Sequence, residues 1–138
     1  MEIEKIISSI LDKQATVYIG SVDEEGYPNT KAMLTPRKRE GIKTFYFHTN
    51  THSMRVQQYR NNSKANLYIC DEFHFQGIML IGNIEVLEDK EHKEMLWQSG
   101  DTMYYSLGVT DPDYCVLKFT AIKGRYYSNF NSESFTVK

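Results

Sequence analysis

The sequence has few cysteines, no long apolar run and almost no net charge. Only two of its 138 residues are cysteines, Cys70 and Cys115, which is too few for a disulfide scaffold. Both lie in apolar, strand-like segments, so a reduced buried pair is favoured over a disulfide. No apolar run approaches the roughly 20 residues of a membrane-spanning helix. The formal net charge of −2 gives no support for a general affinity for nucleic acid or acidic membranes. We expect a cytoplasmic protein whose partners are neither nucleic acid nor membrane.

The composition is that of a folded protein rich in β-structure. Hydrophobic residues make up 41% and charged residues 25% of the chain, as in ordinary globular proteins. Ten tyrosines and seven phenylalanines accompany β-branched residues in short runs, which favours sheet. No repeat, linker or low-complexity block divides the sequence, so residues 1–138 are expected to form a single domain.

Hydrophobic periodicity predicts many short strands and few helices. The chain opens with an amphipathic helix rather than a signal peptide, because aliphatic residues repeat at helical spacing over 3–11. Further helices are expected over 54–60 and from Asp89, its cap, to Gly100. Apolar and alternating runs predict strands over 15–22, 29–35, 43–48, 65–70, 75–86, 114–122 and 125–130.

Glycines and polar runs predict the connections between these strands. Gly77 and Gly82 are expected to form bulges or bends in the long middle strand. The pair at 123–124 predicts a tight turn, and residues 37–41 a charged loop. The polar segment 131–134 is expected to be a mobile tail.

Strands in hairpin succession with few helices describe an antiparallel β-barrel with helices packed on its outside. A barrel of this size is filled by its own side chains. A ligand must therefore lie on the outer wall or between protomers, which points to a homodimer.

Hydroxyl and cationic residues gather after the strand over 43–48. Ser53 can cap the next helix and leave its first N–H groups facing an anion. Thr49 and Ser53 supply hydroxyl donors, and Arg55 can hold phosphate oxygens in a planar fork. Lys31, on the strand over 29–35, offers a second cation. This pattern predicts a phosphorylated cofactor held against the barrel.

Four segments, in their order and spacing, carry a resemblance to a known family. They are residues 15–22 with the turn at 26–28, residues 47–50 with Ser53, residues 80–86, and residues 107–114. The chain resembles the pyridoxamine-phosphate-oxidase-like flavin-binding split barrels over nearly its whole length, and most of all their short general-stress-protein group. The resemblance implies a mainly β, antiparallel split barrel that binds FMN at a homodimer interface.

The resemblance also implies which residues hold FMN. Lys31 stands where the family places a phosphate-binding cation, the backbone of Met33 and Leu34 lies beside the polar edge of the flavin ring, and Ser53 and Arg55 match the ligands at the helix start. The full set is Lys31, Ala32, Met33, Leu34, His48, Thr49, Ser53, Met54, Arg55, Gln76 and Trp97.

The sequence departs from the family pattern at several positions. Oxidases of the family carry basic residues where this chain has Met54 and Pro36, although Arg37 is close enough to replace the second. Gln76 lies one position out of register with the family's glutamine. The chain ends soon after Phe130 and lacks the basic C-terminal segment that holds pyridoxal phosphate, so oxidation of vitamin B6 is not expected.

Other candidate residues have both structural and functional interpretations. Trp97 can pack against the barrel or form a wall over the flavin site from the partner protomer. Tyr104 and Tyr105 can cap the substrate face. His48 and His52 lack a third ligand, so no metal site is expected.

The sequence therefore predicts an FMN-binding flavoprotein, a small oxidoreductase whose chemistry the flavin carries, so that no catalytic side chain is nominated. Besides a second protomer, we expect a small-molecule substrate or electron donor as a partner. Two alternatives stay open: a flavin-binding or stress protein without turnover, and a split barrel that binds haem, a deazaflavin or another small ligand.

Overall fold

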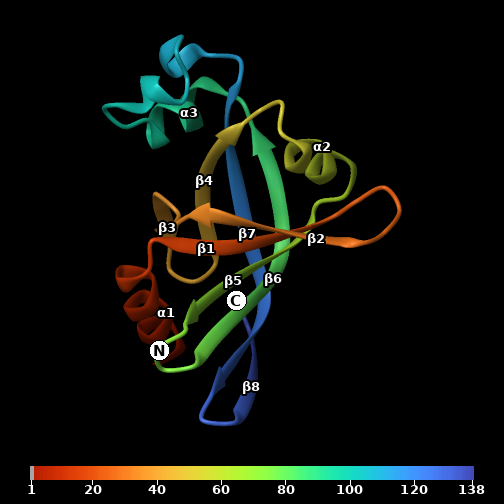
Figure 1. Cartoon of the computed structure of the whole chain (residues 1–138), viewed down its shortest axis with the longest axis vertical. Coiled ribbons are helices and arrows are strands. Elements are labelled where there is room, and N and C mark those ends of the chain that lie inside the picture. Colours follow the sequence, from red (N-terminus) through yellow and green to blue (C-terminus); the bar gives the residue numbers. More distant parts are fainter. Residues whose placement is uncertain (1) are drawn as a thin grey trace.

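The structure of the protein is a computed structural model that describes residues 2–138 (Figure 1). Its helices are α1 (Glu2–Lys13), α2 (Met54–Asn61) and α3 (Lys90–Leu96), with short 3₁₀ turns η1 (Asp101–Met103) and η2 (Gly108–Thr110). Its strands are β1 (Thr16–Val22), β2 (Pro28–Leu34), β3 (Lys38–Glu40), β4 (Thr44–Asn50), β5 (Lys64–Asp71), β6 (Gln76–Leu87), β7 (Tyr114–Ser128) and β8 (Asn131–Thr136).

All strands belong to one antiparallel sheet in the order β2-β1-β5-β6-β7-β4-β3, with β8 also paired to β7. Within residues 2–138, β2 pairs only with β1 and β3 only with β4, so one edge of each is free of strand partners. The sheet curls into a barrel, and the β1–β2 hairpin crosses over the long strands (Figure 1). This is the predicted split β-barrel with helices on its outside.

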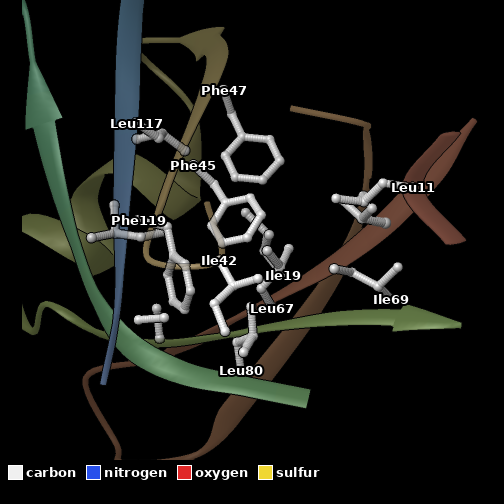
Figure 2. Packing of buried hydrophobic residues seen from close by; sticks show 14 of the residues in the cluster. Leu11, Ile19, Ile42, Phe45, Phe47, Leu67, Ile69, Leu80, Leu117 and Phe119 are labelled. Atoms are coloured by element: carbon white, nitrogen blue, oxygen red, sulfur yellow. The ribbon is translucent and has the colours of Figure 1, made fainter. Parts of the chain in front are cut away.

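The barrel is filled by its own aliphatic and aromatic side chains. Phe45, Phe47, Leu67, Leu80 and Phe119 lie inside it with almost no exposed surface (Figure 2). The apolar face of α1 joins this core, since Ile7, Ile10 and Leu11 are buried there, as the helical spacing predicts. The interior therefore has no space for a cofactor.

A second, smaller apolar cluster lies on the outer face of β4 and β7. It joins Tyr46, Tyr114 and Val116 to Leu96 of α3 and to Tyr105 of the segment that follows α3. This cluster fixes the segment 97–113 against the barrel, so that segment has a defined position although it contains little regular structure.

Two helix boundaries follow from side-chain caps. The Ser53 hydroxyl accepts a hydrogen bond from the backbone N–H of Val56, and the Asp89 carboxylate accepts one from His92 N–H, so both predicted N-caps are confirmed. The third helix ends at Leu96, however, and not at Gly100. Gly100, with φ of +95°, instead begins the 3₁₀ turn at 101–103.

The C-terminal hairpin differs from the prediction. Residues 123–124 are not a turn, because β7 continues through them to Ser128. A side chain at Gly124 would lie 2.6 Å from the Phe135 ring and 2.8 Å from Met79 O, so this glycine permits the close approach of neighbouring strands. The turn lies at 129–130, and residues 131–136 form β8 rather than a mobile tail.

Two other expectations need correction. Residues 38–40 of the predicted charged loop form the short strand β3. The register of β6 against β7 shifts at Gly82, which confirms one predicted bulge, whereas Gly77 pairs in register on both sides. Gly77 is instead covered by the Tyr68 hydroxyl, which lies where its side chain would be.

Candidate functional site

A cavity of about 340 Å³ lies between β2 and β4. The two strands are not hydrogen-bonded to each other, so the cavity occupies the opening of the split barrel. Its lining comes from β2, from the end of β4, from the start of α2 and from the segment after α3: Lys31, Ala32, Met33, Leu34, Thr35, Arg37, Phe47, His48, Thr49, Asn50, Arg55, Tyr104 and Tyr105.

A smaller cavity of about 170 Å³ adjoins the first, and the two share Lys31 and Arg55. Ser21 and Gln58 line it as well, and their side chains are hydrogen-bonded to each other. The two cations therefore lie between two hollows, where a ligand's anionic group can contact both.

Arg55 is half-buried and has no anionic partner in the part of the chain that the structure describes. One of its terminal nitrogens donates to the Thr49 hydroxyl at 3.1 Å, and its Nε is buried without any hydrogen-bond partner. No ion pair among residues 2–138 involves Arg55 or Lys31. Burial lowers the pKa of the Arg55 guanidinium, which means that the folded chain does not compensate its charge.

The first turn of α2 adds to this cationic region. The first N–H groups of a helix have no partner within the helix, and the helix dipole makes this end favourable for anions. Ser53 satisfies only the N–H of Val56, and the first turn contains no acidic side chain. Arg55, Lys31 and the start of α2 together form what we call the cationic end of the cavity.

The opposite end is uncharged and aromatic. His48 Nδ1 lies 2.8 Å from the phenol oxygen of Tyr105, and the His48 ring lies 5.6 Å from the ring of Tyr104 between centroids. Burial, followed by the charge of Arg37, lowers the pKa of His48, so its ring is neutral near pH 7. We call His48, Tyr104 and Tyr105 the aromatic end.

Arg37 also lines the cavity, but its charge is neutralised. It holds both carboxylate oxygens of Asp101, at 2.5 and 2.8 Å, and also donates to Leu96 O. Asp101 additionally accepts the backbone N–H of Gln98. Arg37 lowers the pKa of Asp101, so the pair is fully ionised at neutral pH. This pair anchors the segment after α3 to the barrel.

The structure gathers most of the predicted site residues and separates three of them. Lys31, Ala32, Met33, Leu34, His48, Thr49 and Arg55 line the main cavity, and Met54 lines the smaller one. Ser53 lines neither. Trp97 packs against Tyr105 and Tyr114 in the outer cluster instead of lining a cavity.

Gln76 lies far from the cavity in its own chain. It begins β6, where the next residue pairs with Tyr127 of β7, whereas Asn50 at the cavity pairs with Tyr114 of β7. At about 3.3 Å per residue along a strand, these positions are tens of ångströms apart. Gln76 accepts a hydrogen bond from the Tyr126 hydroxyl.

Several site residues were not found from the sequence. Thr35, Phe47 and Asn50 line the cavity, and Asp101 neutralises Arg37 from 64 positions away in the chain. The first three flank residues that were predicted, so widening each segment by one position would have found them. No local pattern signals the Arg37–Asp101 pair.

The largest cavity, about 1010 Å³, lies elsewhere, between the β3–β4 turn, the middle of β7 and β8. None of the buried polar atoms that lack a partner in residues 2–138 belongs to its lining, and its lysines and Arg125 are exposed. Size alone therefore does not make it the better candidate, and we assign the functional site to the cavity between β2 and β4.

The sequence model of the pyridoxamine 5'-phosphate oxidase family matches residues 3–128, so the chain belongs to this family. Comparison with curated proteins gives no match. None of the helices formed by residues 2–138 has both the length and the apolar character needed to cross a membrane.

Solved structures show the same fold. A Clostridium acetobutylicum protein related to general stress protein 26 of Bacillus subtilis is 41% identical, with a TM-score of 0.88 over 99% of this chain and 95% of that one. General stress protein 26 of Bacillus anthracis is 20% identical, with a TM-score of 0.79 over 99% of this chain and 100% of that one. A haem-binding protein of Mycobacterium smegmatis is 14% identical, with a TM-score of 0.75 over 96% of this chain and 57% of that one.

Proposed function

We propose that this protein binds FMN in the cavity between β2 and β4 and acts as a small cytoplasmic oxidoreductase. The observation that carries the proposal is the half-buried Arg55 guanidinium, which has an unpartnered Nε and no acidic neighbour in ion-pair distance within residues 2–138. A buried cation without a counter-ion is costly, and a phosphate that accepts its hydrogen bonds removes that cost.

Each part of the cavity has a role in this proposal. Arg55, Lys31 and the start of α2 bind the phosphate, and Thr49 holds the guanidinium in place. The backbone of Met33 and Leu34, on the free edge of β2, offers N–H and C=O groups to the polar edge of the ring. FMN, when bound, supplies hydride or electron transfer, and the side chains here bind, orient and shield the ring.

We further propose that the site is completed by a second copy of the chain. Apolar side chains near the cavity are strongly exposed in one copy: Leu34 by 59%, Met54 by 72% and Met103 by 79%. Gln76 reaches a flavin site only if it comes from the partner, since it lies far from the cavity of its own chain. Both observations fit a homodimer with the cofactor at its interface.

Within residues 2–138, the cavity offers a substrate no free cation near its aromatic end. Arg37 is occupied by Asp101 and so has no free charge for an anionic substrate. We nominate no catalytic side chain, because the flavin can exchange electrons with a small molecule without one.

Two other functions deserve a test. One is flavin binding without turnover, as in a stress protein, which fits the general stress protein names of the similar structures. The other is haem binding, which fits the name of the Mycobacterium smegmatis structure with the same fold.

The absorbance spectrum of the freshly purified protein distinguishes these functions. We expect a flavin spectrum, with FMN as the mass released on denaturation, and bleaching when NADH or NADPH is added. A yellow protein that neither nucleotide reduces would favour flavin binding without turnover. A haem spectrum, or a colourless protein that added FMN does not stabilise against heat, would contradict the proposal.

A further inference from the structure

His48 lies between the cavity and a buried tyrosine. Its Nδ1 is 2.8 Å from the Tyr105 phenol oxygen, and the two rings meet edge to face with centroids 5.8 Å apart. The other ring nitrogen, Nε2, makes no hydrogen bond within residues 2–138 and is not among the buried unpartnered atoms. Nε2 is therefore accessible rather than sealed inside the protein, and His48 itself lines the cavity.

The surroundings of Tyr105 decide which group donates in this hydrogen bond. Tyr105 is only 2% exposed, and its phenol oxygen makes no other hydrogen bond in the described part of the chain. Burial raises the pKa of Tyr105, so the phenol keeps its proton at neutral pH. A buried O–H without an acceptor is unfavourable, and His48 Nδ1 is the acceptor within reach. The phenol therefore donates, and Nδ1 carries no proton.

The charge of the His48 ring follows from the groups that face it. These are the Arg37 guanidinium, the Asp101 carboxylate, and the phenols of Tyr104 and Tyr105. Burial and Arg37 lower the pKa of His48, whereas Asp101 acts in the opposite direction and is itself held by Arg37. A neutral imidazole with Nδ1 unprotonated must carry its proton on Nε2.

We infer that His48 presents an Nε2–H donor to the cavity and that Tyr105 is the positioning residue that fixes this tautomer. The site therefore selects an organic ligand with a hydrogen-bond acceptor at this end, such as a carbonyl oxygen or a ring nitrogen. That the acceptor belongs to the flavin ring rests on the proposed function, but the tautomer itself does not.

The same geometry opposes haem ligation through His48. An iron ion binds the lone pair of an imidazole nitrogen, and the nitrogen open to the cavity has its lone pair replaced by a proton. Freeing Nε2 would require Nδ1–H to donate to Tyr105, which would leave the buried phenol proton without its acceptor. Tyr105 thus favours a hydrogen-bond acceptor over an iron ion as the group that His48 contacts.

The tautomer can be measured without any ligand. We would record nitrogen NMR spectra of the histidine-labelled, ligand-free protein at neutral pH and assign His48 by its loss in His48→Gln. We expect a protonated Nε2 and an unprotonated Nδ1, with the tautomer becoming mixed in Tyr105→Phe. A protonated Nδ1, or a doubly protonated ring, would overturn the inference.

Ligand binding provides the second measurement. His48→Leu removes the donor and should weaken FMN binding by about tenfold, whereas His48→Gln retains an N–H group and should stay within about threefold. His74→Gln, which changes an exposed histidine paired with Asp71, is the matched control and should bind as the wild type does. Wild-type affinity in His48→Leu would count against the inference, as would a histidine-ligated haem spectrum that this variant loses.

The two proposals fail in different ways. If the wild type binds no FMN, the proposed function is wrong, and the NMR spectrum of the ligand-free protein still decides the tautomer. If FMN binds and Nδ1 is the protonated nitrogen, only the inference on His48 is wrong.

Discussion

Two partly buried arginines line the cavity, and the chain treats them differently. Near the aromatic end, Arg37 is held by both oxygens of Asp101 and by Leu96 O, so its charge is neutralised within the fold. At the cationic end, the Arg55 side chain hydrogen-bonds only to the Thr49 hydroxyl within residues 2–138 and keeps a buried, unpartnered Nε. The two guanidiniums lie in one cavity, yet one serves the structure and the other is available to a ligand.

Because of this difference, Arg37 should contribute to folding stability and Arg55 to the affinity for an anionic ligand. Breaking a partly buried ion pair leaves an uncompensated charge and costs folding free energy. Removing a cation that no protein group neutralises costs the folded chain little and costs the bound anion its partner. Substitutions at the two ends should therefore change different measured quantities.

The largest effect is expected at the cationic end. Charged hydrogen bonds contribute about 1.5–3 kcal/mol each, so Arg55→Ala should weaken FMN binding by about tenfold or more. The Lys31→Ala, Arg55→Ala double variant should lose about 100-fold or more. Titration of flavin fluorescence measures both affinities.

Arg60→Ala is the matched control for that experiment. Arg60 lies on the same helix but is exposed and paired with Glu88, away from both cavities. It should leave the FMN affinity unchanged. Unchanged affinity in the double variant would refute the assignment of the phosphate site.

The next effect is on stability, at Arg37. Arg37→Ala leaves the nearly buried Asp101 carboxylate without its partner. It should lower the free energy of unfolding by roughly 2 kcal/mol, which is less than for a fully buried pair because Arg37 is partly exposed to solvent. Arg55→Ala should leave the stability of the ligand-free protein unchanged or raise it. Urea unfolding of the two variants makes the comparison, and equal losses would contradict it.

The stability difference at Arg37 should depend on pH. Because Arg37 lowers the pKa of folded Asp101, the pair contributes fully above the unfolded-state pKa of about 4. This contribution is lost as the pH falls through the folded pKa. The gap between wild type and Arg37→Ala should therefore be constant near neutral pH and narrow in acid. A gap that widens as the pH falls would contradict this account of the pair.

The smallest effect is expected at Tyr104, which is 48% exposed. Tyr104→Ala should change the stability by less than about 0.5 kcal/mol, as is usual for surface positions. It should weaken FMN binding only a few-fold, since the ring lies tilted beside His48 and its hydroxyl makes no hydrogen bond within residues 2–138. A loss as large as that of Arg55→Ala would show that the aromatic end, and not the cationic end, dominates binding.

Much of the fold could be predicted because its signals are local. Periodicity located α1, and the caps Ser53 and Asp89 began the next two helices. The predicted turn at residues 123–124 was wrong, because the sequence alone does not show which of two roles Gly124 has. A glycine can make a turn or can admit a neighbouring strand, and only the packing of Phe135 and Met79 against it decides.

The site residues also fall into those that local sequence signals reveal and those that only long-range contacts define. Lys31 and Arg55 belong to recognisable segments, so their meeting at one cavity could be predicted. The His48–Tyr105 hydrogen bond spans 57 positions and the Arg37–Asp101 pair 64, and no periodicity reports such distant partners. Trp97 was ambiguous for a related reason, because a helix-terminal tryptophan can pack on the barrel or face a ligand, and here it packs.

The most direct test of the phosphate site compares FMN with riboflavin, which lacks only the phosphate. Calorimetric titration of both into the wild-type protein should show FMN binding about 100-fold or more tightly, with the two affinities converging in the Lys31→Ala, Arg55→Ala variant. Equal affinities in the wild type would contradict the central claim that an unpaired, half-buried arginine holds the phosphate.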